Sequence, residues 1–257
     1  MRSVAGTELS RDQYLIHLNS DYRLLAAAIA GAPVDVPSCP GWTTDDLVKH
    51  MAQVYLHQAF VVETGSAPEN KEHLSPYPRT EDFLEFMGWG FAAITKALDV
   101  NRAERKTWSW HHSDFTVDFW FRRMAHETVI HRIDAELAVG AVTPVDEALA
   151  LDGVDEVLDF LPLMGSWPEV PNIDFGIVSI VASTKNGSKV WDLNFTNEAA
   201  TVSAVAESHA DARLVISGDA EAMDLYLWGR INSSDPRISI TGEGEETFKQ
   251  LMQVAVL

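Results

Sequence analysis

The sequence has a single cysteine, Cys39, in 257 residues. No intrachain disulfide can form, and the cysteine content gives no indication of an oxidising compartment. Long apolar runs are also missing. No stretch approaches the ~20 residues of a membrane-spanning helix, and the N-terminus lacks the apolar core of a signal peptide. These absences predict a cytoplasmic protein that folds without covalent cross-links.

Basic residues are scarce as well. The 19 Lys and Arg residues face 38 Asp and Glu residues, which gives a formal net charge of −19. This charge repels nucleic acid and anionic membrane surfaces, so a small-molecule partner is expected. The chain also lacks a Gly-rich phosphate loop and the dinucleotide-binding fingerprint of Rossmann domains.

Residues 1–165 have the periodicity of a helical bundle. Apolar residues recur at helical spacing with Gly or Pro at the ends of the segments, although Gly88 and Gly90 weaken the third one. The expected helices span about 10–30, 44–63, 80–100, 122–139 and 144–163. This pattern predicts an N-terminal bundle.

Beyond the Pro-rich stretch Gly165–Pro171, the apolar period changes to that of strands. The pair Asn186-Gly187 between two apolar runs is a strong hairpin signal. Strands are expected at about 174–183, 189–196, 201–207, 212–217 and 237–241, and helices at 220–230 and 245–256. Residues 166–257 are therefore predicted to form a small α+β domain, separate from the bundle of residues 1–165.

The long fourth helix carries the first functional signal. Glu127 and His131 are four residues apart, so they lie on the same helix face and can bind one metal ion. The zinc-peptidase motif that begins with His126-Glu127 would require histidine at the position of Ile130. Glu127 is therefore expected to be a metal ligand, and a third ligand must come from elsewhere.

His50 is the candidate for that third ligand because it lies among the apolar residues of the second helix. Bundles build metal sites from inward-facing side chains of separate helices. The alternatives are a core histidine at position 50 and an exposed ion pair of Glu127 with His131. Arg123 is expected to pair with Glu127, whereas Asp134 either orients a ligand or is solvated. Cys39 is expected to be a small buried residue.

Three segments resemble the mycothiol-dependent maleylpyruvate isomerase family. They are SCPGWT at 38–43 followed by His50, RMAHETVIHRIDA at 123–135, and DLYLWGR at 224–230. The resemblance implies a DinB-like four-helix bundle that binds a divalent metal, usually zinc, through His50, Glu127 and His131. It further implies a sterol-carrier-like α+β domain and an arginine, here Arg230, that reaches the substrate.

The resemblance also implies an enzyme that uses mycothiol on a small electrophilic, carboxylated substrate. The thiolate would add to a conjugated cis double bond, and elimination after rotation would give the trans isomer; thiol transfer would stop at the adduct. Two other functions stay open: a zinc hydrolase, and a non-catalytic protein that binds a small ligand. Zinc, nickel and cobalt all accept this ligand set.

Overall fold

The computed structural model describes residues 9–70, 82–99, 101, 104–111, 114–163, 175–196 and 199–256. The chain forms two compact units, one of Ser10–Thr143 and one built mainly from Pro144–Leu257. Within the described residues, no helix is both long and apolar enough to cross a membrane.

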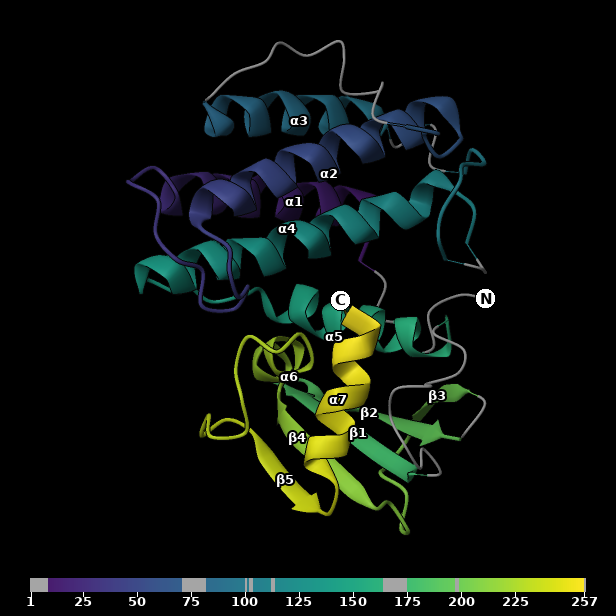
Figure 1. Cartoon of the computed structure of the whole chain (residues 1–257). Helices are drawn as coiled ribbons and strands as arrows, with labels where there is room; N and C mark the ends of the chain where they lie inside the picture. Colours follow the sequence, from purple (N-terminus) through teal and green to yellow (C-terminus); the bar gives the residue numbers. More distant parts are fainter. Residues whose placement is uncertain are drawn as a thin grey trace. The chain divides into compact units, whose positions relative to one another are not determined.

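The N-terminal unit is a bundle of four helices (Figure 1). They are α1 (Arg11–Ala28), α2 (Thr44–Thr64), α3 (Phe83–Ala97) and α4 (Val117–Val139). Helix α2 packs against α3 and α4, and α1 packs against α4. The predicted helices are thus present, each within a few residues of its expected ends.

Local sequence signals set the helix ends. Ser10 and Thr43 each form a capping box, in which the side chain accepts a hydrogen bond from the backbone three residues later. Helix α4 ends where Gly140 adopts a φ of 70°, a left-handed conformation that costs glycine little. Capping at these positions fixes where α1 and α2 begin and where α4 ends.

A buried ion network joins α1 to α4. The guanidinium of Arg132, which is 1% exposed, lies 3.2 Å from Asp21 Oδ1 of α1 and 2.9 Å from Glu136 Oε2 of its own helix. Arg132 also donates a 2.7 Å hydrogen bond to the carbonyl oxygen of Thr143. Because charges leave water at high cost unless they are paired, these partners restrict how α4 can rotate against α1.

The C-terminal unit contains a five-stranded sheet in the order β3-β2-β1-β4-β5. Its strands are β1 (Gly176–Thr184), β2 (Gly187–Phe195), β3 (Ala200–Val205), β4 (Leu214–Asp219) and β5 (Ser239–Gly242). The predicted Asn186-Gly187 hairpin joins β1 to β2, while β1 and β4 pair in parallel. The sheet is therefore mixed.

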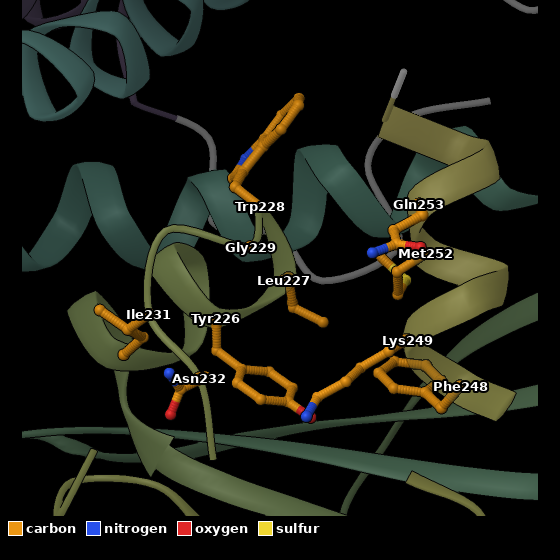
Figure 2. Close-up of a pocket in the computed structure, with 10 residues that line it drawn as sticks. All are labelled: Tyr226, Leu227, Trp228, Gly229, Ile231, Asn232, Phe248, Lys249, Met252 and Gln253. Atoms are coloured by element: carbon orange, nitrogen blue, oxygen red, sulfur yellow. The ribbon is translucent and has the colours of Figure 1, made fainter. Parts of the chain in front are cut away.

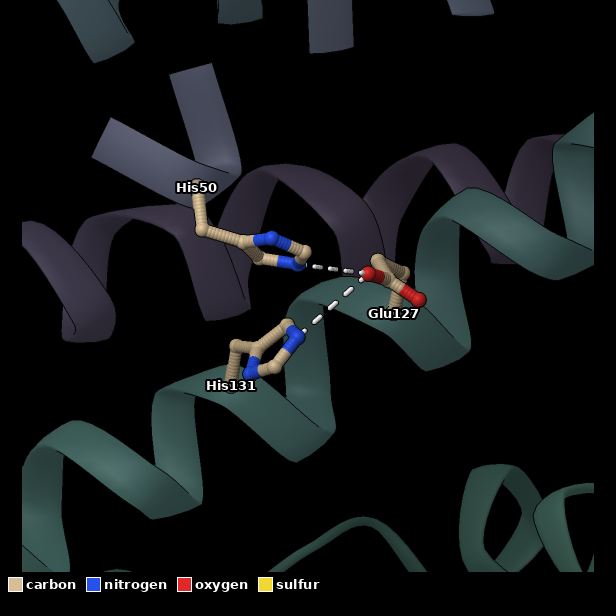
Figure 3. Close-up of side chains that lie close together, drawn as sticks. All are labelled: His50, Glu127 and His131. Carbon is tan, nitrogen blue, oxygen red and sulfur yellow. Dashed lines mark ion pairs between the residues drawn. The ribbon is translucent and has the colours of Figure 1, made fainter. Parts of the chain in front are cut away.

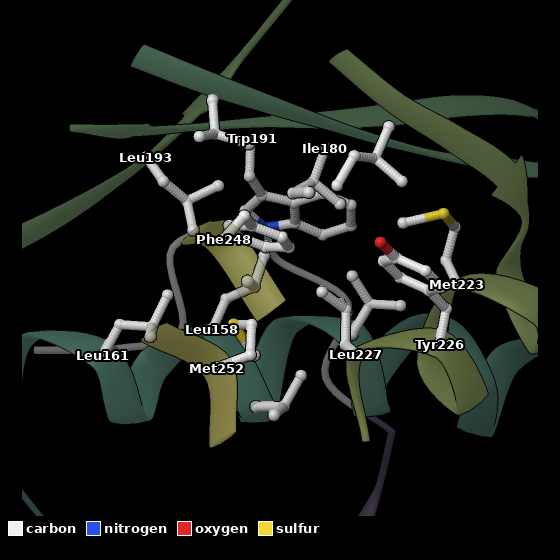
Figure 4. Close-up of a cluster of buried hydrophobic side chains, with 14 of the residues drawn as sticks. Leu158, Leu161, Ile180, Trp191, Leu193, Met223, Tyr226, Leu227, Phe248 and Met252 are labelled. Carbon is white, nitrogen blue, oxygen red and sulfur yellow. The ribbon is translucent and has the colours of Figure 1, made fainter. Parts of the chain in front are cut away.

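Three helices cover one face of this sheet: α5 (Glu147–Phe160), α6 (Ala220–Leu227) and α7 (Glu245–Val256). Alternate residues of the strands, such as Ile180, Trp191 and Leu193, point into the shared core (Figure 4). Phe248 of α7 is fully buried there and makes an edge-on ring contact with Phe195. The fold is thus a helical domain followed by an α+β domain, as predicted.

Helix α5 belongs to the C-terminal unit. Its apolar stripe of Val154, Val157 and Leu158 packs into the core over the sheet. The compact units divide between Thr143 and Pro144, before α5, whereas the boundary expected from the sequence at 165/166 lies after it. The Pro-rich stretch Gly165–Pro171, on which that expectation rested, is outside the described residues.

The two glycines of α3 allow a matched test of the packing between α2 and α3. A methyl group at Gly90 would lie 2.8 Å from the carbonyl oxygen of Ala52, whereas one at Gly88 would meet only Tyr22 Oη, at 3.6 Å. Gly88→Ala should raise the free energy of unfolding by about 0.5–1 kcal/mol. Gly90→Ala should lower it by about 1–3 kcal/mol because it forces the helices apart.

Denaturant unfolding of the two variants and the wild type measures both changes. Equal stabilisation by the two substitutions would show that α2 and α3 do not approach each other closely at Gly90.

Candidate metal centre

Three side chains from two helices of the N-terminal unit converge (Figure 3). His50 comes from α2, and Glu127 and His131 come from α4. Each offers one ligand atom, and the three atoms lie within 4.8 Å of one another. No other group of His, Cys, Asp or Glu in the described part of the chain meets this criterion.

The distances suit a metal ion better than hydrogen bonds. Glu127 Oε1 lies 3.4 Å from His50 Nε2 and 3.3 Å from His131 Nε2. Good N–H···O hydrogen bonds are shorter, at about 2.7–3.2 Å. Ligand atoms placed about 2.0–2.2 Å from a tetrahedral zinc ion are separated by about 3.4 Å. The three side chains therefore fit a divalent cation bound between them.

The cluster is accessible from solvent. The side chain of His50 is 35% exposed, against 18% for Glu127 and 13% for His131. The ring of Trp42 lies beside His50, with the two ring centres 5.0 Å apart. The partial exposure of His50 thus leaves the cluster open to solvent.

Asp134 contacts the ring nitrogen of His131 that does not face Glu127. Its Oδ2 lies 2.8 Å from His131 Nδ1, which leaves Nε2 to face Glu127. Asp134 is fully buried, and its other oxygen accepts a 2.5 Å hydrogen bond from Ser38 Oγ. Such carboxylates fix the orientation and tautomer of a metal-binding histidine. Of the two roles considered for Asp134, the orienting one fits this geometry.

Cys39 lies in the same turn as Ser38. It is only partly buried, and its Sγ donates a long hydrogen bond of 3.6 Å to Asp134 Oδ2. The thiol therefore supports the buried carboxylate.

Arg123 engages the second oxygen of Glu127. Its Nη2 lies 2.6 Å from Glu127 Oε2, the ion pair that the four-residue spacing predicted. Because Oε2 is occupied in this way, only Oε1 of Glu127 faces the two histidines. Glu127 is thereby prepared to act through a single oxygen.

These contacts also govern protonation. Burial raises the pKa of Glu127, but the charge of Arg123 and the nearby imidazoles of His131 and His50 outweigh it and hold this pKa well below its usual value. For His131, burial lowers the pKa, but the hydrogen bond with Asp134 and the nearby carboxylate of Glu127 raise it to about 9. At neutral pH a carboxylate and an imidazolium therefore face each other.

Two domain models match the chain. Residues 15–136 match "Mycothiol maleylpyruvate isomerase N-terminal domain", and residues 148–247 match "MDMPI C-terminal domain". The chain belongs to the mycothiol-dependent maleylpyruvate isomerase family. No curated protein matches the sequence.

Solved structures resemble the fold at low sequence identity. The crystal structure of mycothiol-dependent maleylpyruvate isomerase superposes with a TM-score of 0.62 at 13% identity, covering 93% of this chain and 96% of that one. A histidine-to-alanine mutant of that enzyme gives a TM-score of 0.59, also at 13% identity and with the same coverage. Sterol Carrier Protein 2 from Yarrowia lipolytica covers 44% of this chain and 95% of its own, at 13% identity and a TM-score of 0.30.

Arg230 lies in the C-terminal unit, just after α6, and not in the unit that contains the three candidate ligands. It is half-buried, and its Nη1 donates a 2.6 Å hydrogen bond to the carbonyl oxygen of Trp228. Its contact with a substrate stays a prediction. Sequence reasoning missed two contacts of the cluster, those of Ser38 and Trp42, because the SCPGWT segment was interpreted as a family motif without contacts being assigned to its side chains.

Metal binding can be tested by stability. If zinc binds only the folded protein, a concentration of 100 times its dissociation constant should raise the free energy of unfolding by about 2.7 kcal/mol. His50→Ala should remove most of this increment because it deletes one of three ligands. His57→Ala, on the same helix but outside the cluster, should keep it. Equal stabilisation of both variants by zinc, in calorimetric melts, would contradict the assignment.

The role of Asp134 predicts a graded loss of metal affinity. Asp134→Asn should weaken zinc binding by about 10–100-fold, because the amide does not hold His131 Nδ1 as the carboxylate does. Ser38→Ala, which removes only a support of Asp134, should have a smaller effect. Competition with a chromogenic chelator measures both affinities without depending on stability. Wild-type affinity in Asp134→Asn would make this carboxylate a purely structural group.

Proposed function

We propose that the protein is a metal-dependent enzyme that uses mycothiol to act on a small electrophilic, carboxylated substrate. The reaction is a cis-trans isomerisation of the maleylpyruvate isomerase type or a thiol transfer. The observation that carries this proposal is the convergence of His50, Glu127 and His131 within 4.8 Å in a member of this family.

The donor set supports a catalytic metal. Two neutral imidazoles and one carboxylate would leave a divalent ion with a net charge of about +1 and at least one open position, as in catalytic zinc sites. Structural zinc sites are closed and rich in thiolates, and this chain has only Cys39. When bound, zinc would lower the pKa of a thiol or a water molecule at the open position.

The surrounding residues would keep the three ligands in place. Asp134 presents Nε2 of His131 to the ion, and Arg123 keeps Oε2 of Glu127 engaged. With Glu127 limited to one oxygen, room is left for the thiol. Because Glu127 serves as a ligand, it is not available as the general base that a zinc hydrolase needs.

Arg230 is the proposed substrate-binding residue. A guanidinium binds a carboxylate through two parallel hydrogen bonds, which suits a small organic acid. A chain with a net charge of −19 would otherwise repel an anionic substrate. The proposal therefore assigns the thiol to the metal cluster and the carboxylate to Arg230.

Calorimetric titration of mycothiol into zinc-loaded protein tests the function. Saturable binding with one site per chain is expected, and His131→Ala should abolish it because the variant cannot hold the ion. Maleylpyruvate should be converted to its trans isomer only when mycothiol and zinc are both present. Mycothiol binding that is unchanged in His131→Ala, or turnover of a substrate without thiol, would overturn the proposal; the latter would favour a hydrolase.

Arg230 can be tested separately by kinetics. Arg230→Ala should raise KM for the carboxylated substrate by about 10–100-fold, the value of a hydrogen bond to a charged group. Arg230→Lys should recover part of this loss because the charge remains. Zinc affinity should not change in either variant. A fall in unfolding midpoint with an unchanged KM would assign Arg230 to packing against Trp228.

A further inference from the structure

A cavity lined by residues of the C-terminal unit lies between the end of α6 and the face of α7 (Figure 2). Its volume is about 240 Å³. The apolar part of its wall consists of the buried side chains of Tyr226 and Leu227 from α6 and of Phe248 and Met252 from α7. The catalytic proposal makes no use of this space.

The charged lining residue, Lys249, belongs to a connected polar group at one side of the cavity. Lys249 lines the cavity, and its Nζ lies 2.5 Å from Glu245 Oε1. The hydroxyl of Tyr226 donates a long hydrogen bond of 3.4 Å to the same oxygen. Figure 2 shows the tips of Tyr226 and Lys249 close together on one side of the space. The cavity thus has mostly apolar walls and a charged corner at Lys249, and Asn232 and Gln253 are its other polar side chains.

The charge of this corner is balanced. Hydrogen bonds from Lys249 and Ser233 lower the pKa of Glu245, so that Glu245 is ionised at neutral pH and offsets the ammonium group of Lys249. An ammonium group has three donors, of which Glu245 and a weak contact of 3.5 Å with Ser233 Oγ use two. The third donor can serve a ligand, but an added carboxylate would meet Glu245.

The volume limits the ligand to a small one. A dry cavity of about 150 Å³ accommodates benzene, so 240 Å³ accommodates a benzene ring with a short side chain. Ligand pockets combine mostly apolar walls with a few polar groups that fix orientation. Both features are present here.

We propose that this cavity binds a compact, uncharged molecule with an apolar body the size of one aromatic ring and one oxygen acceptor that contacts Lys249. This site goes beyond the metal-dependent function, and neither depends on the other.

Two probes of nearly identical shape test the charge preference. 3-Phenylpropanamide and 3-phenylpropanoate differ mainly in the charge of the head group. In titrations followed by two-dimensional NMR of the full chain, the amide should bind with a dissociation constant of about 1 mM or below. Its shifts should centre on residues 226–232 and 248–253, and the carboxylate should bind at least about tenfold more weakly because Glu245 repels it.

Substitutions on the surface of α7 locate the site without disturbing the core. Gln253 is exposed and lines the cavity, whereas Gln250 is exposed on the same helix but does not line it. Gln253→Trp should abolish amide binding by filling the entrance, and Gln250→Trp should retain it. Glu245→Gln leaves the Lys249 charge unbalanced, so the carboxylate should then bind more tightly than the amide.

Three outcomes would overturn the inference: no saturable shifts with the amide, equal loss of binding in the two tryptophan variants, or tighter binding of the carboxylate by the wild type. Because the assay needs neither zinc nor mycothiol, its failure leaves the proposed catalytic function untouched. Loss of mycothiol binding in His131→Ala would likewise say nothing about this cavity.

Discussion

The helical period of α4 is the constraint on which the candidate metal centre depends. At 3.6 residues per turn, Glu127 and His131 point the same way, and Asp134 is close enough to hold the back of the imidazole. A shift of one residue would rotate each side chain by about 100° and separate them from His50. The register of α4 within the bundle therefore matters more than any single contact of the cluster.

The buried charges of α4 can be explained by the need to fix the register of this helix in the bundle. Arg132 is not explained by stability alone, because well-packed apolar side chains often contribute as much to the free energy of unfolding as a buried ion pair does. Its pairing with Asp21 of α1 and with Glu136, however, permits one rotation of α4 and penalises others with an unpaired charge. We interpret the network as a device for register, on the same helix that presents Glu127 and His131.

The sequence predicted what depends on local chemistry. The Asn186-Gly187 turn and the spacing of Glu127 and His131 both act within a few residues, and each has the expected structural result. What depends on distant partners was not predictable. The apolar stripe of α5 is compatible with a bundle or a sheet, and only the tertiary structure shows that it packs on the sheet.

The contacts of the candidate metal centre likewise divide into those that have a local sequence signal and those that depend on distant residues. The position of His50 among apolar residues made it a candidate partner of Glu127, with a core histidine as the alternative, but the bond of Ser38 to Asp134 joins residues 96 positions apart and has no local signature. The charged group beside the C-terminal cavity shows the same difference between local and distant contacts. The four-residue spacing of Glu245 and Lys249 predicts their ion pair, but only the fold brings Tyr226 to the same oxygen.

The pKa of His131 sets a competition between a proton and a divalent ion at the candidate metal centre. With its pKa raised to about 9, His131 is an imidazolium at neutral pH and lies between the carboxylates of Glu127 and Asp134. The proton thus provides the positive charge that the metal would otherwise supply. A divalent ion that enters must displace this proton, so binding exchanges one cation for another in ligands already in position. The contacts that raise the pKa of His131 are therefore also the ones that would orient its imidazole for a metal ion.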